Sequence, residues 1–190
     1  MSTTIIIGLG NPGEQYKNTR HNAGFMALDK SVKENNFPDF VFEKKYNAEI
    51  AESKIGGKKV ILAKPQTFMN NSGKTAGALA KIYKLKSKNF IIIHDDADLP
   101  LGKIKIIKER GSAGHKGVES VIKAVGNKDL ARIRIGTASK KNIKAENIVL
   151  KNLNEDEKTL IKKAVKKAAE AFLTIINENL EKAMNEFNTQ

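Results

Sequence analysis

The chain has 190 residues and carries 34 Lys and Arg against 21 Asp and Glu, which gives a net charge of +13. The absence of cysteine excludes disulfide scaffolds, thiolate nucleophiles and Cys-ligated zinc, and the longest apolar runs fall far short of the roughly 20 residues that span a bilayer. The length fits a single domain over residues 1–190. Without a signal-peptide pattern after Met1, we expect a cytoplasmic protein. The basic excess indicates a polyanionic partner and leaves RNA, DNA and acidic membrane surfaces open.

The first half of the chain alternates predicted strands with predicted helices. In chain order these elements are a strand at Ile5–Ile7, a helix through Phe25, Leu28 and Val32, a hairpin turn at Gly56-Gly57 between Ala48–Ile55 and Lys58–Leu62, a helix at Gly73–Lys84 after the capping residues Asn71-Ser72, and a strand at Phe90–Ile93. An Asp-rich turn is expected to end the last strand. Because a hairpin joins antiparallel strands, the sheet is expected to be mixed.

Two strands predicted in the second half, at Lys103–Glu109 and Ala131–Thr137, alternate apolar with basic residues. Alternate residues of a strand face the same side, so a basic face is expected. It would carry Lys103, Lys105, Arg132 and Arg134. A helix through Val118–Val125 and two amphipathic helices in the tail complete the pattern. The elements together predict an α/β single domain in which a twisted mixed sheet is sandwiched between helices.

Four clusters rich in Gly, Asn or Asp stand where predicted strands end or predicted helices begin, the usual place for ligand sites in α/β proteins. They are Gly8–Gly13, Thr67–Gly73, His94–Pro100 and Gly111–Gly117. The first formally matches G-x-G-x-x-G, the fingerprint of a dinucleotide site. We interpret it as a turn, because Pro12 and the polar stretch to Thr19 delay the helix that the fingerprint requires.

The three histidines of the chain, His21, His94 and His115, lie in or near these clusters. An isolated polar histidine at a helix start, such as His21, is more often a surface or capping residue than a catalyst. Asp95 can accept an imidazole N–H, which would fix the tautomer and favour the charged ring during proton transfer, or it can simply form a turn. With no cysteine and no G-x-S-x-G motif, water is the natural attacking group.

Neutral amides and a glycine-rich loop add further candidates. Asn11, Asn70 and Asn71 can hold a carbonyl or stabilise an oxyanion, or they can only shape turns. The loop Gly111–Gly117, flanked by basic residues, can bind phosphate through its backbone N–H groups. A divalent metal at His94–Asp98 is a competing hypothesis, although the spacing matches neither a calcium loop nor H-E-x-x-H.

Six segments of the chain form an ordered set of motifs. They are Ile7–Gly13, Tyr16–Gly24, Lys64–Gly73, His94–Gly102, Gly114–Gly117 and Arg132–Gly136. This set resembles the bacterial-type peptidyl-tRNA hydrolase family, which needs no cofactor. The family hydrolyses the ester between a peptide and the 3′-terminal ribose of tRNA and so releases the tRNA for reuse in translation. The resemblance implies an esterase acting on peptidyl-tRNA, a substrate that suits the net charge of +13.

The resemblance also implies roles for side chains at the matching positions. His21 would be the general base that activates water, Asp95 would orient it, and Asn70 would bind the carbonyl or stabilise the oxyanion. The peptide and the 3′ end of the tRNA would contact Asn11, Tyr16, Phe68, Met69, His115 and Lys116. Phosphates of the acceptor arm would contact Lys105, Lys108, Arg132 and Arg134. We expect a monomer that uses no metal, no membrane and no obligate protein partner.

Two segments depart from the family pattern. Lys116 stands where the family commonly has asparagine, and Thr137–Lys140 replaces the frequent Ile-Gly-Arg-Pro. We expect Lys116 to alter the contact with tRNA without abolishing catalysis. Two other classes stay open from the sequence alone: a non-catalytic RNA-binding protein, and a metal- or nucleotide-dependent enzyme.

Overall fold

One mixed sheet of seven strands organises the chain in a computed structural model, which describes residues 2–138 and 150–188. In spatial order the strands are β2 (Val41–Glu43), β3 (Ala48–Ile55), β4 (Lys58–Pro65), β1 (Thr3–Gly8), β5 (Phe90–Pro100), β7 (Ala131–Ala138) and β6 (Ile104–Lys108). The four central strands are parallel, while β2, β3 and β6 pair antiparallel with their neighbours. The carboxyl ends of the central strands therefore meet at one edge of the sheet, where α/β proteins bind ligands.

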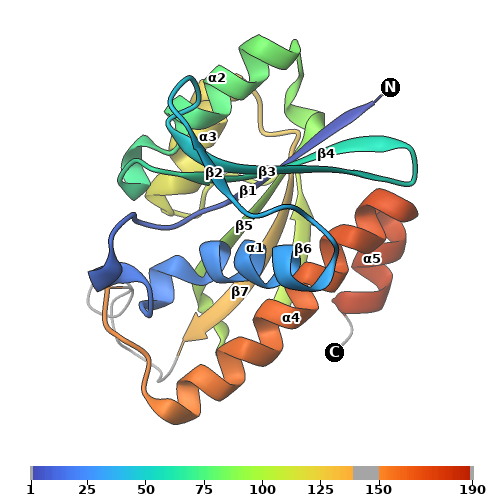
Figure 1. The fold of residues 1–190 in the computed structure, drawn as a ribbon. Helices are drawn as coiled ribbons and strands as arrows, with labels where there is room; N and C mark the ends of the chain where they lie inside the picture. Colours follow the sequence, from blue (N-terminus) through green and yellow to red (C-terminus); the bar gives the residue numbers. More distant parts are fainter. Residues whose placement is uncertain (1, 139–149, 189–190) are drawn as a thin grey trace.

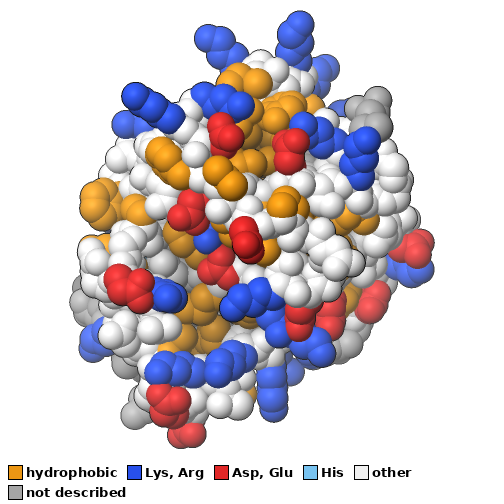
Figure 2. Space-filling model, in the orientation of Figure 1, with side chains coloured by type: hydrophobic (Ala, Val, Ile, Leu, Met, Phe, Trp, Pro, Cys, Tyr) orange, Lys and Arg blue, Asp and Glu red, His pale blue; other side chains and the backbone are white. Residues whose placement is uncertain are grey.

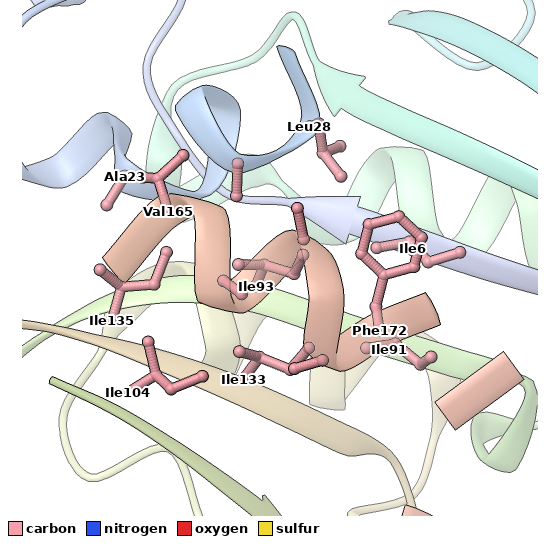
Figure 3. Packing of buried hydrophobic residues seen from close by; sticks show 14 of the residues in the cluster. Ile6, Ala23, Leu28, Ile91, Ile93, Ile104, Ile133, Ile135, Val165 and Phe172 are labelled. Carbon is pink, nitrogen blue, oxygen red and sulfur yellow. The ribbon is translucent and has the colours of Figure 1, made fainter. Parts of the chain in front are cut away.

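Helices cover both faces of this sheet (Figure 1). One face carries α2 (Gly73–Tyr83) and α3 (Lys116–Val125), and the other carries α1 (Ala23–Glu34), α4 (Glu155–Asn177) and α5 (Leu180–Phe187). Each layer buries its own core, because successive residues of a strand point to opposite faces. Figure 3 shows Phe172 of α4 packed near Ile6 and Ile91 of the sheet. No helix in the described ranges is both long enough and apolar enough to span a membrane.

Gly24 lets the beginning of α1 press directly against the sheet. A Cβ atom at this position would lie 2.4 Å from the Ile93 carbonyl oxygen and 2.4 Å from the Leu9 nitrogen. Only a residue without a side chain fits such a close approach of helix and strands. The 3₁₀ turn Arg20–Asn22, which directly precedes α1, is thereby held beside the ends of β1 and β5.

The beginning of α4 fixes the same turn from the other side. Arg20 is 5% exposed, forms an ion pair with Glu157 and donates a hydrogen bond to the Lys151 carbonyl at 3.3 Å. Glu157 also accepts from the Asn154 backbone N–H at 3.0 Å, and Asn154 caps the helix in return. One carboxylate therefore both caps α4 and holds the segment that precedes His21.

The predicted α/β fold with a mixed sheet between helices is confirmed, two local expectations are wrong, and one strand was not predicted. The strand expected to end at Ile93 continues as β5 to Pro100, because β7 pairs with Asp95 and Asp96 where the Asp-rich turn was expected. The short edge strand β2 has no counterpart among the predicted elements. Ser72 does not cap α2, since its hydroxyl donates to the Met69 carbonyl at 2.8 Å.

Replacing Gly24 by alanine is expected to destabilise the fold by about 1–3 kcal/mol, because the added methyl group collides with backbone atoms that cannot move aside. Gly77 in α2 is the matched control, since a Cβ there would meet its nearest neighbour, Ala124, at an ordinary 3.7 Å. Gly77→Ala should stabilise the protein by about 0.5–1 kcal/mol through helix propensity. Urea unfolding of both variants tests this, and two changes of the same sign would contradict the close docking of α1.

Candidate active site

A cavity of about 580 Å³ opens at the carboxyl ends of the central strands. Six segments, drawn from both helical layers, meet around it. The residues at its wall include Asn11, His21, Phe68, Met69, Asn70, Asp95, His115, Lys116 and Leu150. The fold thus gathers the first cluster, the turn before α1, the turn before α2, the end of β5, the loop before α3 and the segment before α4 at one place.

Asp95 lies at the centre of this site and binds two histidines through one oxygen. Its Oδ1 is 2.8 Å from Nδ1 of His21 and 2.9 Å from Nε2 of His115. The Asp95 side chain is 2% exposed, against 14% for His21 and 11% for His115. Burial alone would raise the pKa of the Asp95 carboxyl, but its interactions with His115 and His21 outweigh burial and hold the pKa well below its usual range. The carboxylate is therefore ionised and acts as an acceptor.

The hydrogen bonds assign the tautomers of both histidines. Nδ1 of His115 accepts from the Val118 backbone N–H at 3.3 Å, so the ring proton is on Nε2 and is donated to Asp95. His21 presents Nδ1–H to the same carboxylate, which leaves the lone pair on Nε2. An imidazole held in this way is a base whose protonated form the neighbouring carboxylate stabilises.

Amide groups form another part of the cavity wall. Asn11 is 7% exposed, and its side-chain oxygen accepts from the Met69 backbone N–H at 2.8 Å. This bond fixes the turn Met69–Asn71, which presents the exposed Asn70 to the cavity. Phe68, with 59% of its surface exposed, adds an apolar patch beside Asn70. The cavity therefore combines a base, a neutral amide donor and an apolar surface.

A family model described as peptidyl-tRNA hydrolase matches residues 5–190 of the chain. The chain belongs to the peptidyl-tRNA hydrolase family. It is 42% identical to the peptidyl-tRNA hydrolase of Thermoanaerobacter sp. (strain X514) over 97% of this chain and 98% of that protein. It is 40% identical to the peptidyl-tRNA hydrolase of Aquifex aeolicus over 100% of this chain and 98% of that one. The crystal structure of the Acinetobacter baumannii peptidyl-tRNA hydrolase matches with a TM-score of 0.89 at 28% identity, covering 98% and 94% of the two chains.

Most peptide-site residues that the family resemblance implies lie at the cavity wall, and Tyr16 is the exception. Tyr16 ends the 3₁₀ turn Glu14–Tyr16 and is absent from the wall of the cavity. Its carbonyl accepts from the Thr19 N–H at 2.9 Å and from the Thr19 hydroxyl at 2.8 Å. The expected contact of Tyr16 with the substrate therefore has no support in this arrangement, in which Tyr16 shapes the loop that leads to His21.

The four expected phosphate contacts do not form one surface. Lys105 pairs in register with Arg134, and the two share the face of the sheet opposite the core residues Ile104 and Ile106. Lys108 has the same parity as these isoleucines and faces the other way, where it pairs with Glu109 and Asp129 at 3.1 Å.

The expectation that Arg132 contacts phosphate is wrong for this structure. Arg132 is 2% exposed and donates to the Gly111 carbonyl at 2.6 Å. Burial, with the positive charge of Arg134, lowers the pKa of Arg132 to about 10. The guanidinium thereby holds the loop before α3. Strand alternation correctly predicted the face of the sheet on which Arg132 lies, but it could not predict that a loop covers this side chain.

The competing metal and nucleotide hypotheses are not favoured by the side-chain chemistry. Asp96 accepts from Arg134 and from the Asp98 backbone N–H, so its carboxylate is already used. Among the described residues, the ligand-type atoms that cluster within 4.8 Å belong to His21, Asp95 and His115. A metal there would need the lone pair on Nε2 of His115, the nitrogen that carries the proton. The turn reading of the first cluster is confirmed, because α1 begins at Ala23, well after Gly13.

Leu150 is a wall residue to which the sequence analysis assigned no role. It is 53% exposed and lies at the cavity although it follows β7 by more than ten residues in the chain. In the segment Thr137–Lys140, which departs from the family pattern, Ser139 and Lys140 lie outside the described residues.

Replacing His94 by phenylalanine is expected to flatten the dependence of the unfolding free energy on pH. Burial, together with unfavourable electrostatic interactions with His115 and Arg132, lowers the pKa of His94 from 6.5 to about 3. Between these two pKa values the unfolded state therefore binds more protons than the folded state. The free energy of unfolding of the parent protein falls by up to about 1.4 kcal/mol per pH unit as the pH decreases through this range. Urea unfolding between about pH 7 and about pH 5 measures how the unfolding free energies of the parent and of His94→Phe depend on pH. Equal slopes for the two proteins would contradict this prediction.

Proposed function

We propose that the chain hydrolyses the ester between a peptide and the 3′-terminal ribose of tRNA, with His21 as the base that activates water. The observation that carries the proposal is the bond from His21 Nδ1 to Asp95 at 2.8 Å, which leaves Nε2 as the proton acceptor in a cavity that also holds an exposed amide. Membership of the peptidyl-tRNA hydrolase family supplies the substrate class.

The reaction needs few groups. His21 takes a proton from water, and the hydroxide attacks the ester carbonyl to form a tetrahedral intermediate. The Asn70 amide donates to the oxyanion, and Asp95 stays ionised and stabilises the imidazolium. The intermediate collapses when His21 returns the proton to the departing ribose oxygen. A ribose oxygen leaves more easily than an amide nitrogen, so ordinary peptide bonds are expected to survive.

Apolar and amide groups of the cavity would hold the two ends of the substrate. Phe68, Met69 and Leu150 form the apolar part of the wall and suit peptide side chains. The Asn11 side-chain NH2 can donate to the substrate because its oxygen is occupied by Met69. Lys116, exposed at the beginning of α3, suits the anionic tRNA end.

Phosphates of the acceptor arm would bind along the face that carries Lys105 and Arg134. Figure 2 shows Lys and Arg side chains spread over the visible face with Asp and Glu between them, so the charge of +13 acts there as a general field and not as one patch. We expect one copy of the chain to act as a monomer in the cytoplasm, where its tRNA substrate occurs.

Replacing His21 by alanine should lower kcat by roughly 10²- to 10⁴-fold on N-acylated aminoacyl-tRNA, in the presence of EDTA, because the general base is lost. Asn70→Ala should lower kcat by about 10²- to 10³-fold through loss of the oxyanion donor. Asn71 is the matched control for Asn70, since it is its neighbour in the same turn and is absent from the cavity wall. Acyl release and tRNA binding are measured together. A parent protein that binds tRNA without turnover would favour the non-catalytic RNA-binding alternative.

Replacing Lys105 by alanine should weaken tRNA binding and reduce the slope of log affinity against log salt by about one, because one phosphate contact is lost. Lys108→Ala is the control, since it removes the same charge from the same strand on the opposite face. Binding at several salt concentrations measures both slopes. Equal effects of the two variants would mean that the charge acts only through the general field.

A further inference from the structure

We propose that His94 is a positioning residue, which fixes the backbone of Asp95 through its Nδ1–H and so keeps the carboxylate aligned on His21. The inference rests on the proposed function for its kinetic consequence, and on geometry for its structural part. Nδ1 of His94 lies 2.7 Å from the backbone oxygen of Asp95. His94 is 2% exposed and touches the reaction only through its neighbour.

The Asp95 carbonyl needs this donor because a neighbouring strand has ended. The last bond between β1 and β5 runs from the Leu9 N–H to the Ile93 carbonyl at 2.9 Å. Along a strand, carbonyls two residues apart face the same side, so the Asp95 carbonyl points to where β1 has already left the sheet. A buried carbonyl in this place must find a donor elsewhere. His94 supplies it from the adjacent position in the chain.

The other ring nitrogen, Nε2, indicates that the hydrogen bond made by Nδ1 is what requires a histidine at position 94. Nε2 of His94 is buried and has no hydrogen-bond partner among the described residues. A phenylalanine would fill the same space without leaving an acceptor unpaired, so packing alone favours phenylalanine. The ring also meets His115 edge-on, with centroids 4.7 Å apart. An aromatic ring of either kind can make that contact, whereas only histidine also makes the bond to Asp95.

His94 stays neutral and therefore keeps Nδ1–H as its donor. The ionisable groups that act on it are His115 before α3, Asp95 on its own strand and Arg132 on β7. Burial and the electrostatic interactions with His115 and Arg132 oppose protonation of His94 and outweigh the attraction of Asp95. The ring thus carries one proton, on the nitrogen that faces the Asp95 carbonyl. Asp95 receives bonds from three histidines in all, two on its carboxylate and one on its backbone.

The first test uses the parent protein and side-chain nitrogen NMR, which is tractable because the chain has 3 histidines. His94 is expected as the Nδ1–H tautomer at neutral pH, and His115 as the Nε2–H tautomer. An Nε2–H tautomer for His94 overturns the inference. This measurement needs neither a variant nor turnover, so it stands even if the parent fails to cleave the ester and the proposed function fails.

The second test compares two variants that each keep one feature of the histidine side chain. His94→Asn keeps an N–H donor close to the position of Nδ1, whereas His94→Phe keeps the ring and loses the donor. His94→Phe is expected to lower kcat about tenfold with little change in KM, the effect of one lost hydrogen bond, and to move the acid limb of the kcat–pH profile to lower pH. His94→Asn should retain a kcat and an acid limb close to those of the parent.

The outcomes separate positioning from packing. A merely structural role would lower the melting temperature of His94→Phe and leave its acid limb in place, and that result overturns the inference. Equal losses of kcat in the Asn and Phe variants also overturn it, because the donor would then be irrelevant. If His94→Phe does not fold, the tautomer in the parent protein decides.

Discussion

The rest of the structure must bring hydrogen-bond donors to a single buried carboxylate, that of Asp95. A carboxylate with 2% of its side chain exposed is stable in ionised form only when donors reach it, and here they come from both helical layers. His21 stands before α1 on one face of the sheet, and His115 stands before α3 on the other. The end of β5 is where these two layers come within reach of one atom. The position of the site therefore follows from electrostatics at the edge of the sheet.

The C-terminal part of the chain restrains the segment that carries His21. Arg20, next to His21, is held by Glu157 at the beginning of α4, and Leu153 N–H donates to the Asn18 carbonyl at 3.1 Å. A buried ion pair contributes little net stability, since the desolvation of both charges offsets their attraction, yet breaking it leaves a buried charge without a partner. Its effect here is geometric. It fixes the turn that carries His21 from the side of α4.

The sequence predicted the layers of this fold well because they depend on local patterns. The β-branched runs and helical periodicities that mark β1, β4, β5 and α1 to α5 are read over a few residues. Contacts that define the site span much longer distances in the chain. Arg20 and Glu157 are 137 residues apart, and no local pattern pairs them. His21 and Asp95 were linked by an ordered set of motifs and not by periodicity. Alternation placed Arg132 on the correct face, but the loop that buries it is a tertiary feature.

Lys116 shows where stability and function oppose each other in this site. It occupies the first position of α3, where the helix macrodipole disfavours a positive charge and favours an acidic residue such as Glu119 in the same turn. Lys116 is exposed at the cavity wall, and no ion pair with it is found among the described residues. A neutral or acidic residue would stabilise the helix better, so fold stability does not account for the lysine. The contact proposed for Lys116, with the anionic 3′ end of the tRNA, would supply a reason for this lysine that helix stability does not.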